Sequence, residues 1–146
     1  MEEITYIKSP EKIFDVLELF SDSLQSLQSG VNYRRRMAEK FAEYGIFFFI
    51  SEEKIEGFAA FYANDKKERI AYLSMIAVLP EFRDRHIGKR VLEECIRTSI
   101  EAGMSEMRLE VNKKNQTAIV FYEKNGFSII ENQIGEKSFY MQKVLR

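Results

Sequence analysis

Three apolar segments of strand length follow one another near the middle of the chain. They cover residues 46–50, 57–62 and 70–78, and short polar turns at residues 52–54 and 64–68 separate them. Turns this short join neighbouring antiparallel strands, because a parallel connection needs a dozen or more residues. The chain is therefore predicted to contain an antiparallel three-stranded meander around which the rest of the fold must pack.

Helical and strand patterns flank this meander on both sides. Before it, a short strand over residues 4–7 precedes a helix that starts at Ser9-Pro10 and keeps one apolar face up to Gly30, and a second helix covers residues 33–44. After it, the patterns predict a helix, a strand, a short helix and two strands, over residues 88–103, 107–111, 115–122, 127–130 and 139–144.

The predicted order of elements is β-α-α-β-β-β-α-β-α-β-β. Such an order indicates an α/β fold with an α+β mixed sheet, because the late β-α-β unit supplies one parallel pair among antiparallel strands. Helices are expected on both faces of the sheet.

Length and net charge limit the classes of protein to which this chain can belong. The 146 residues have the length of one domain, so residues 1–146 are treated as a single domain. The 22 basic and 23 acidic residues give a formal net charge of -1, whereas a general nucleic-acid binder carries a positive excess. We therefore expect no nucleic-acid partner.

Cysteine, histidine and hydropathy exclude further classes. Cys95 is the single cysteine and His86 the single histidine, so no disulfide framework and no metal site are expected. No apolar run approaches the roughly 18 residues that a membrane-spanning helix needs, and the first ten residues lack the apolar core of a signal peptide. The expectation is a cytoplasmic protein without a membrane partner.

Residues 76–92 carry the most specific functional signal. They run from a strand through a proline turn into a loop with Arg83, Arg85 and Lys89, and then into an amphipathic helix. The start of a helix has unpaired N–H groups and a partial positive charge, so a helix placed directly after a strand favours an anion such as pyrophosphate. A solvated basic loop is the alternative interpretation. The nucleotide fingerprints GxxxxGK[ST] and GxGxxG are both absent.

In this segment the sequence resembles the GCN5-related N-acetyltransferase (GNAT) family. Its members carry Arg/Gln-x-x-Gly-x-Gly/Ala at the start of a helix, which residues 83–88 (RDRHIG) match with His86 in place of the first glycine. A second family element, an Asn and a Tyr on a short helix before Gly-Phe, corresponds to Asn115, Tyr122 and Gly126-Phe127. The order of elements agrees with the family from about residue 2 to residue 144.

The resemblance implies acetyl-CoA as the donor, an amine as the acceptor, and a sheet splayed between its fourth and fifth strands for the pantetheine arm. It implies that backbone groups near the end of the fourth strand pair with the pantetheine amides and stabilise the oxyanion, and that the following loop binds the pyrophosphate. It also implies that Asn115 contacts the pantetheine arm and that Tyr122 lies near the thioester sulfur. The implied cofactor-binding residues are Ile76, Ala77, Val78, Arg83, Asp84, Arg85, His86, Ile87, Gly88, Lys89, Asn115 and Tyr122.

Proton transfer in such a reaction points to Tyr122 and leaves the base open. A tyrosine hydroxyl, with an ordinary pKa of about 10, suits protonation of a leaving thiolate, and we predict this catalytic role for Tyr122; ordinary helix packing is the alternative. Ser74 and Met75 stand where related enzymes often place a carboxylate. The base is therefore a water chain touching Ser74, or Glu110, or bulk solvent.

The acceptor side is expected along the first two helices, as the resemblance implies. The candidate acceptor-binding residues are Tyr33, Arg34, Phe47 and Ser74. An arginine there favours an acceptor with a phosphate or carboxylate, whereas most basic runs are solvated helix faces.

The leading hypothesis is an N-acetyltransferase in which a primary amine attacks the thioester directly through a tetrahedral intermediate, with the acceptor unknown. His86 and the missing carboxylate motivate the alternative of a non-catalytic acyl-CoA-binding or sensing module of the same fold. An interaction domain without affinity for CoA is a third hypothesis. A homodimer is common in the family, but no feature of this sequence demands one.

Overall fold

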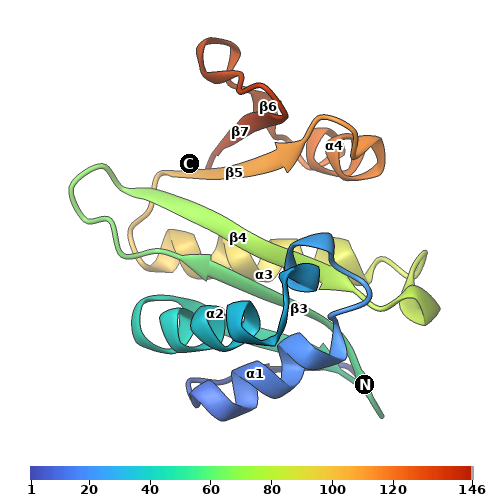
Figure 1. Cartoon of the computed structure of the whole chain (residues 1–146). Helices are drawn as coiled ribbons and strands as arrows, with labels where there is room; N and C mark the ends of the chain where they lie inside the picture. The colour runs from blue at the N-terminus through green and yellow to red at the C-terminus, as the bar shows by residue number, and fades with distance from the viewer. Residues whose placement is uncertain (146) are drawn as a thin grey trace.

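The computed structural model describes residues 1–145, and its elements follow the predicted order (Figure 1). The elements are β1 (Glu3–Tyr6), α1 (Pro10–Leu19), η1 (Gln25–Ser29), α2 (Val31–Tyr44), β2 (Ile46–Ser51), β3 (Ile55–Tyr62), β4 (Ile70–Val78), η2 (Pro80–Phe82), α3 (Ile87–Glu101), β5 (Glu106–Asn112), α4 (Gln116–Lys124), β6 (Ser128–Ile129), η3 (Glu131–Gln133) and β7 (Ser138–Val144), where η marks a 3-10 helix.

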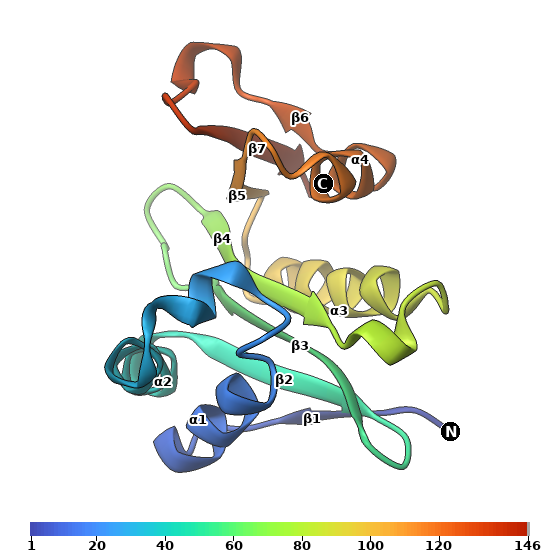
Figure 2. The same cartoon turned by 45° about the vertical axis from the view of Figure 1, so that its right-hand side comes forward.

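The strands form one mixed sheet in the order β1-β2-β3-β4-β5-β7-β6. β4 and β5 are parallel, as a crossover through α3 requires, and the other neighbours are antiparallel. β4 pairs with β5 only where residues 70–72 meet residues 106–108, although β4 continues to Val78. Beyond this short pairing the two strands diverge (Figure 2), which confirms the predicted splay between the fourth and fifth strands.

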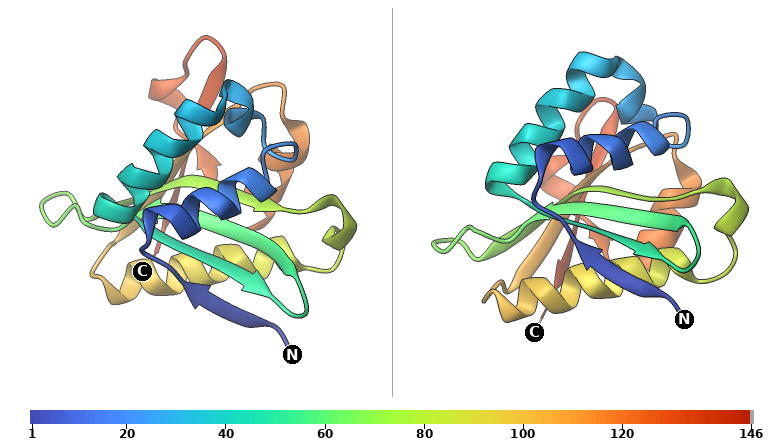
Figure 3. Two further views of the ribbon diagram at one scale, coloured as in Figure 1. Left: turned by 60° about the horizontal axis from the view of Figure 1, so that its bottom comes forward. Right: turned by 90° about the horizontal axis from the view of Figure 1, so that it is seen from below.

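A hydrophobic core lies on each face of the sheet. Successive side chains of a strand point to opposite faces, so the apolar run of β2 serves both cores. Phe47 belongs to the core that includes α1 and α2 on one face, and Phe48 belongs to the core that includes α3 and α4 on the other. Figure 3 shows α1 and α2 on the opposite side of the sheet from α3, which confirms that helices cover both faces.

The first helix is shorter than its periodicity predicted. We expected one helix up to Gly30, but α1 ends at Leu19 and the chain turns before η1. The Ser21 hydroxyl donates to the Glu18 carbonyl at 2.9 Å, a side-chain bond that competes with helix continuation. Leu27 is still fully buried, because the short 3-10 helix turns it toward the core.

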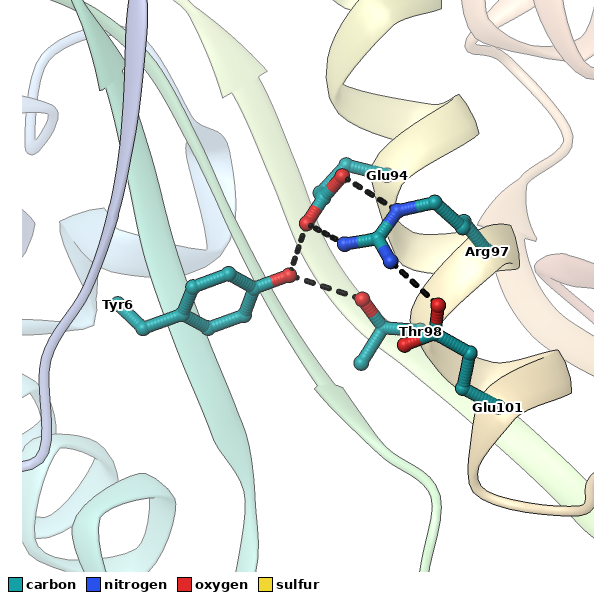
Figure 4. Close-up of polar contacts among 5 residues, drawn as sticks. All are labelled: Tyr6, Glu94, Arg97, Thr98 and Glu101. Atoms are coloured by element: carbon teal, nitrogen blue, oxygen red, sulfur yellow. Dashed lines mark hydrogen bonds and ion pairs between the residues drawn. The ribbon is translucent and has the colours of Figure 1, made fainter.

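A polar network joins the edge strand β1 to α3 (Figure 4). The Tyr6 hydroxyl donates to the Glu94 carboxylate and lies 2.8 Å from the Thr98 hydroxyl. Arg97 donates to Glu94 and to Glu101, each at 2.6 Å. This network attaches β1 to the helix that follows the candidate anion-binding loop.

Candidate functional site

The loop between β4 and α3 presents a row of unpaired backbone N–H groups. The first intrahelical bond of α3 runs from the Arg90 N–H to the His86 carbonyl at 3.2 Å. Within residues 1–145, no acceptor contacts the N–H groups of residues 84–89, and His86 gives α3 no side-chain cap. A helix start left open in this way favours a bound anion.

The backbone of this loop adopts an uncommon conformation at two positions. Asp84 has φ of 64° and His86 has φ of 62°, both in the left-handed region that favours glycine. Left-handed residues between ordinary ones turn successive N–H groups toward one side, which makes a concave anion-binding surface. His86 therefore takes the conformation that a glycine in the family motif adopts freely.

A cleft of about 630 Å³ lies in front of this loop. Its walls come from the end of β4 and the loop on one side and from α4 on the other, and its lining residues are Val78, Phe82, Arg83, Asp84, His86, Ile87, Gly88, Lys89, Thr117, Phe121, Lys124 and Asn125. Arg83 Nε donates to the Val78 carbonyl at 3.4 Å, which holds this guanidinium at the end of β4. Arg85 instead lies over the Phe82 ring, 5.7 Å from its centroid.

β4 carries a bulge where it leaves β5. Ala60 of β3 pairs with Met75 and Phe61 pairs with Leu73, so Ser74 has no partner on β3. Bulges leave backbone groups unpaired, bend the strand and occur often beside active sites. Ile76, Ala77 and Val78 pair with β3 but lie beyond the last β5 pair, so the β5 side of their backbone faces the splay. Nothing in the sequence signals this bulge, because no glycine or proline marks it.

Tyr122 projects from α4 into the core beside the splay. Its side chain is 9% exposed and packs edge-on against Phe121 and Phe127. Burial, with smaller contributions from Cys95 and Tyr72, raises the pKa of Tyr122 well above its ordinary value. The phenol therefore stays protonated to a higher pH than an ordinary tyrosine. Cys95 is fully buried, and burial raises the pKa of its thiol, as expected of a core residue rather than a nucleophile.

Glu110 lies with two tyrosines on the face of β5 that points away from α3. Leu109 and Val111 are buried in the core beside α3 and α4, so Glu110 between them points to the opposite face. Glu110 pairs with Tyr140 across β5 and β7. Burial and the neighbouring Glu110 charge raise the pKa of Tyr72, the last β4 residue paired with β5.

A second cavity, of about 710 Å³, opens at the C-terminal end of β5. It is lined by Gln25 of η1, by the β5–α4 connection and by the segment before β7, and its lining residues are Gln25, Asn112, Lys113, Lys114, Asn115, Glu136 and Lys137. Asn115 caps α4, because its Oδ1 accepts from the Ala118 N–H at 3.1 Å. The amide group of Asn115 is left as a donor at the edge of this cavity. The sequence did not single out the lysines of this cavity, because their proximity depends on strand pairing.

Two residues expected on the acceptor side, Arg34 and Phe47, make contacts within the fold. The Arg34 side chain forms an ion pair with Glu18 and donates to the Leu27 carbonyl at 2.6 Å, so it connects α2 to α1 and η1. Phe47 is 2% exposed and stacks on Phe58 at 5.3 Å, deep in the core. Tyr33 is half-buried against the same core and Ser74 is half-buried at the bulge.

Residues 1–145 contain no group of three or more His, Cys, Asp or Glu side chains placed to hold a metal ion. No helix in this part of the chain is long and apolar enough to cross a membrane.

Comparison with known proteins places the chain in a family. Residues 13–127 match the model of the acetyltransferase (GNAT) family. A spermidine N(1)-acetyltransferase from Thermoplasma acidophilum is 33% identical over 73 residues, which are 50% of this chain and 44% of the length of that relative. The match thus spans less than half of the curated relative.

Solved structures share the fold at low sequence identity. The ribosomal-protein-S18-alanine N-acetyltransferase from Escherichia coli has a TM-score of 0.80 at 19% identity, with 99% of this chain and 94% of that chain covered. The PaiA N-acetyltransferase from Thermoplasma acidophilum, in complex with coenzyme A, has a TM-score of 0.77 at 21% identity, with 97% and 99% covered. Since the family model matches well over half of the sequence, the predicted resemblance is confirmed: the chain belongs to the acetyltransferase (GNAT) family.

Proposed function

We propose that this chain transfers the acetyl group of acetyl-CoA to a primary amine by direct attack of the amine. The observation that carries the proposal is the row of unpaired N–H groups at residues 84–89, which faces a cleft of about 630 Å³ beside the splayed strand β4. Bound acetyl-CoA would supply the activated acetyl thioester, and the protein would bind it, orient it and move protons.

The unpaired N–H groups of residues 84–89 form a concave surface, here called the cradle, which is suited to the pyrophosphate of the cofactor. Its backbone N–H groups would donate to the phosphate oxygens, and Arg83, Lys89 and Lys124 add positive charge around the same cleft. The free backbone edge of Ile76 to Val78 suits the amides of the pantetheine arm, which would occupy the place of a neighbouring strand.

Three groups around the splay would each take part in the reaction. Unpaired backbone N–H groups near the Ser74 bulge suit an oxyanion that develops on the acetyl carbonyl. Tyr122, whose raised pKa keeps the phenol protonated also at alkaline pH, would donate to the leaving sulfur. Glu110 lies on the face of β5 that points away from α3, and it is the carboxylate that we assign to accept the proton of the amine. Holding both reactants in this splay contributes through proximity.

A binding assay and a turnover assay test the proposal together. Acetyl-CoA and CoA should both raise the thermal midpoint, because a ligand that binds only the folded state stabilises it. Acetyl-CoA with an amine panel should release free thiol. Lys89→Glu should raise the KM for acetyl-CoA about tenfold, because it reverses a charge beside the phosphates, whereas Lys66→Glu in the β3–β4 turn should not.

Two results would contradict the proposal in different ways. An unchanged thermal midpoint with both ligands would show that the cradle does not bind the cofactor. A raised midpoint without thiol release from any amine would instead support the non-catalytic acyl-CoA-binding module.

A further inference from the structure

The cavity of about 710 Å³ at the end of β5 carries an excess of positive charge. Lys113, Lys114 and Lys137 line it, and Glu136 is the single acidic residue of the lining. The ion pairs found within residues 1–145 include none of these three lysines. A concave surface with uncompensated charge of one sign attracts ligands of the opposite sign.

The fold holds two of these lysines next to each other. The Lys113 N–H donates to the Lys137 carbonyl at 2.9 Å, which extends the β5–β7 ladder beyond the pair of Asn112 with Ser138. Like charges on directly opposed residues destabilise a pair of strands. The Lys113 ammonium also lies over the Phe139 ring, 5.4 Å from its centroid, which restrains its position. An anion between the two ammonium groups would relieve this repulsion.

This cavity is separate from the cleft assigned to the cofactor. No residue lines both, and α4 lies between them, with Asn115 at one and Thr117 at the other. Gln25 contributes to the cavity from η1, which belongs to the layer of α1 and α2. Asn115, which was expected to contact the pantetheine arm, lines this cavity and not the cleft at residues 84–89. The cavity would therefore adjoin the arm, and its lysines remain open to the second substrate.

One lining residue of the cavity, Asn112, lies near the assigned base in the sequence. Asn112 lies two residues from Glu110 on the same strand, so both side chains point to the same face of β5. Lys113 points to the other face of β5, over Phe139, so an acceptor with its anionic end at the lysines would extend past Asn112, around the end of β5, to reach Glu110. The volume falls within the range of small-molecule sites, about 300–1,000 Å³.

We infer that the acceptor is a small amine that carries a carboxylate or phosphate, and that Lys113, Lys114 and Lys137 bind this anionic group. The inference rests on the proposed acetyl transfer and names the chemical class of its second substrate. A polyamine is the opposite case, because its cationic chain would meet the lysines unfavourably.

Matched pairs of amines that differ in the anionic group test the inference. The pairs are phosphoethanolamine against ethanolamine and β-alanine against β-alaninamide, with spermidine as the polycation; phosphate and carboxylate acceptors are thereby distinguished. The anionic member of at least one pair should have a kcat/KM about tenfold higher, and its KM should rise with ionic strength because the attraction is screened.

Lysine variants give the second readout. Lys114→Gln and Lys137→Gln should each raise the KM for the anionic amine about fivefold, as expected for a partly exposed ion pair, and should leave the KM for acetyl-CoA unchanged. Lys66→Gln, in the β3–β4 turn, is the matched control and should change neither value.

The outcomes separate this inference from the function on which it rests. Preference for ethanolamine and β-alaninamide, or for spermidine, would overturn the inference of an anionic acceptor and leave acetyl transfer intact. Unchanged KM values in both lysine variants would do the same. Bound acetyl-CoA with no thiol release from any amine would overturn the proposed function itself.

Discussion

Replacing Tyr122 with phenylalanine separates catalysis from folding. The variant removes a single oxygen from a side chain that is 9% exposed. No residue in the described part of the chain is hydrogen-bonded to this hydroxyl, so its removal leaves no buried partner unsatisfied, and the free energy of unfolding should change by less than about 1 kcal/mol. Any large effect on turnover therefore reports on chemistry.

The expected loss of rate follows from the role of the hydroxyl. A positioned general acid contributes about 100-fold or more, so kcat should fall about 100-fold, which corresponds to about 2.7 kcal/mol of activation free energy. The KM for acetyl-CoA should change less than kcat, because the cradle at residues 84–89 stays intact. Since the pKa of Tyr122 is raised, its loss should lower kcat evenly between about pH 6 and pH 9.

Thiol release at saturating acetyl-CoA measures kcat, and thermal denaturation of the same sample checks the fold. Tyr44→Phe is the matched control, because Tyr44 is 58% exposed at the end of α2. An unchanged kcat in a folded Tyr122→Phe protein would refute the assignment of Tyr122 as the proton donor.

Two further predictions concern stability. Arg34→Met should lower the free energy of unfolding by about 2 kcal/mol, or roughly 6 °C in Tm, because it leaves Glu18 and the Leu27 carbonyl without their partner; a changed KM for acetyl-CoA with an unchanged Tm would instead place Arg34 at the site. Burial raises the pKa of Tyr6 to about 12, so its contribution to stability is fully present below about pH 10 and is lost as the pH rises toward 12. Urea titrations should show a smaller loss between pH 9 and 12 in Tyr6→Phe than in the unaltered protein, and equal losses would contradict this prediction.

The order of elements could be predicted because each one has a local signal. The meander has short polar turns, the late helices have capping residues and breaking glycines, and the β-α-β unit implies a parallel pair. The end of α1 was predicted wrongly, because Leu24 and Leu27 fit a helix and a 3-10 turn equally well. The side-chain bond of Ser21 at the end of α1 favours the turn, and periodicity does not show it.

The sequence indicated a candidate anion-binding loop because one short motif holds all its parts. The motif of residues 83–88 is local, and the N–H groups of residues 84–89 have no acceptor within residues 1–145. The acceptor side depends on contacts between distant segments, such as Arg34 with Glu18 or Lys113 with Lys137. Periodicity showed a basic run on α2, but it did not show which cations are already paired.

The short pairing between β4 and β5 has a consequence for how the molecule responds to its cofactor. In the described residues, the β4–β5 ladder that joins the β1–β4 half of the sheet to the β5–β7 half has three residue pairs. A pantetheine arm in the gap would act as an eighth strand that joins the halves, so cofactor binding should slow amide hydrogen exchange on both sides of the gap. On this reasoning the protein alone is an incomplete sheet, and the proposed substrate would supply its missing segment.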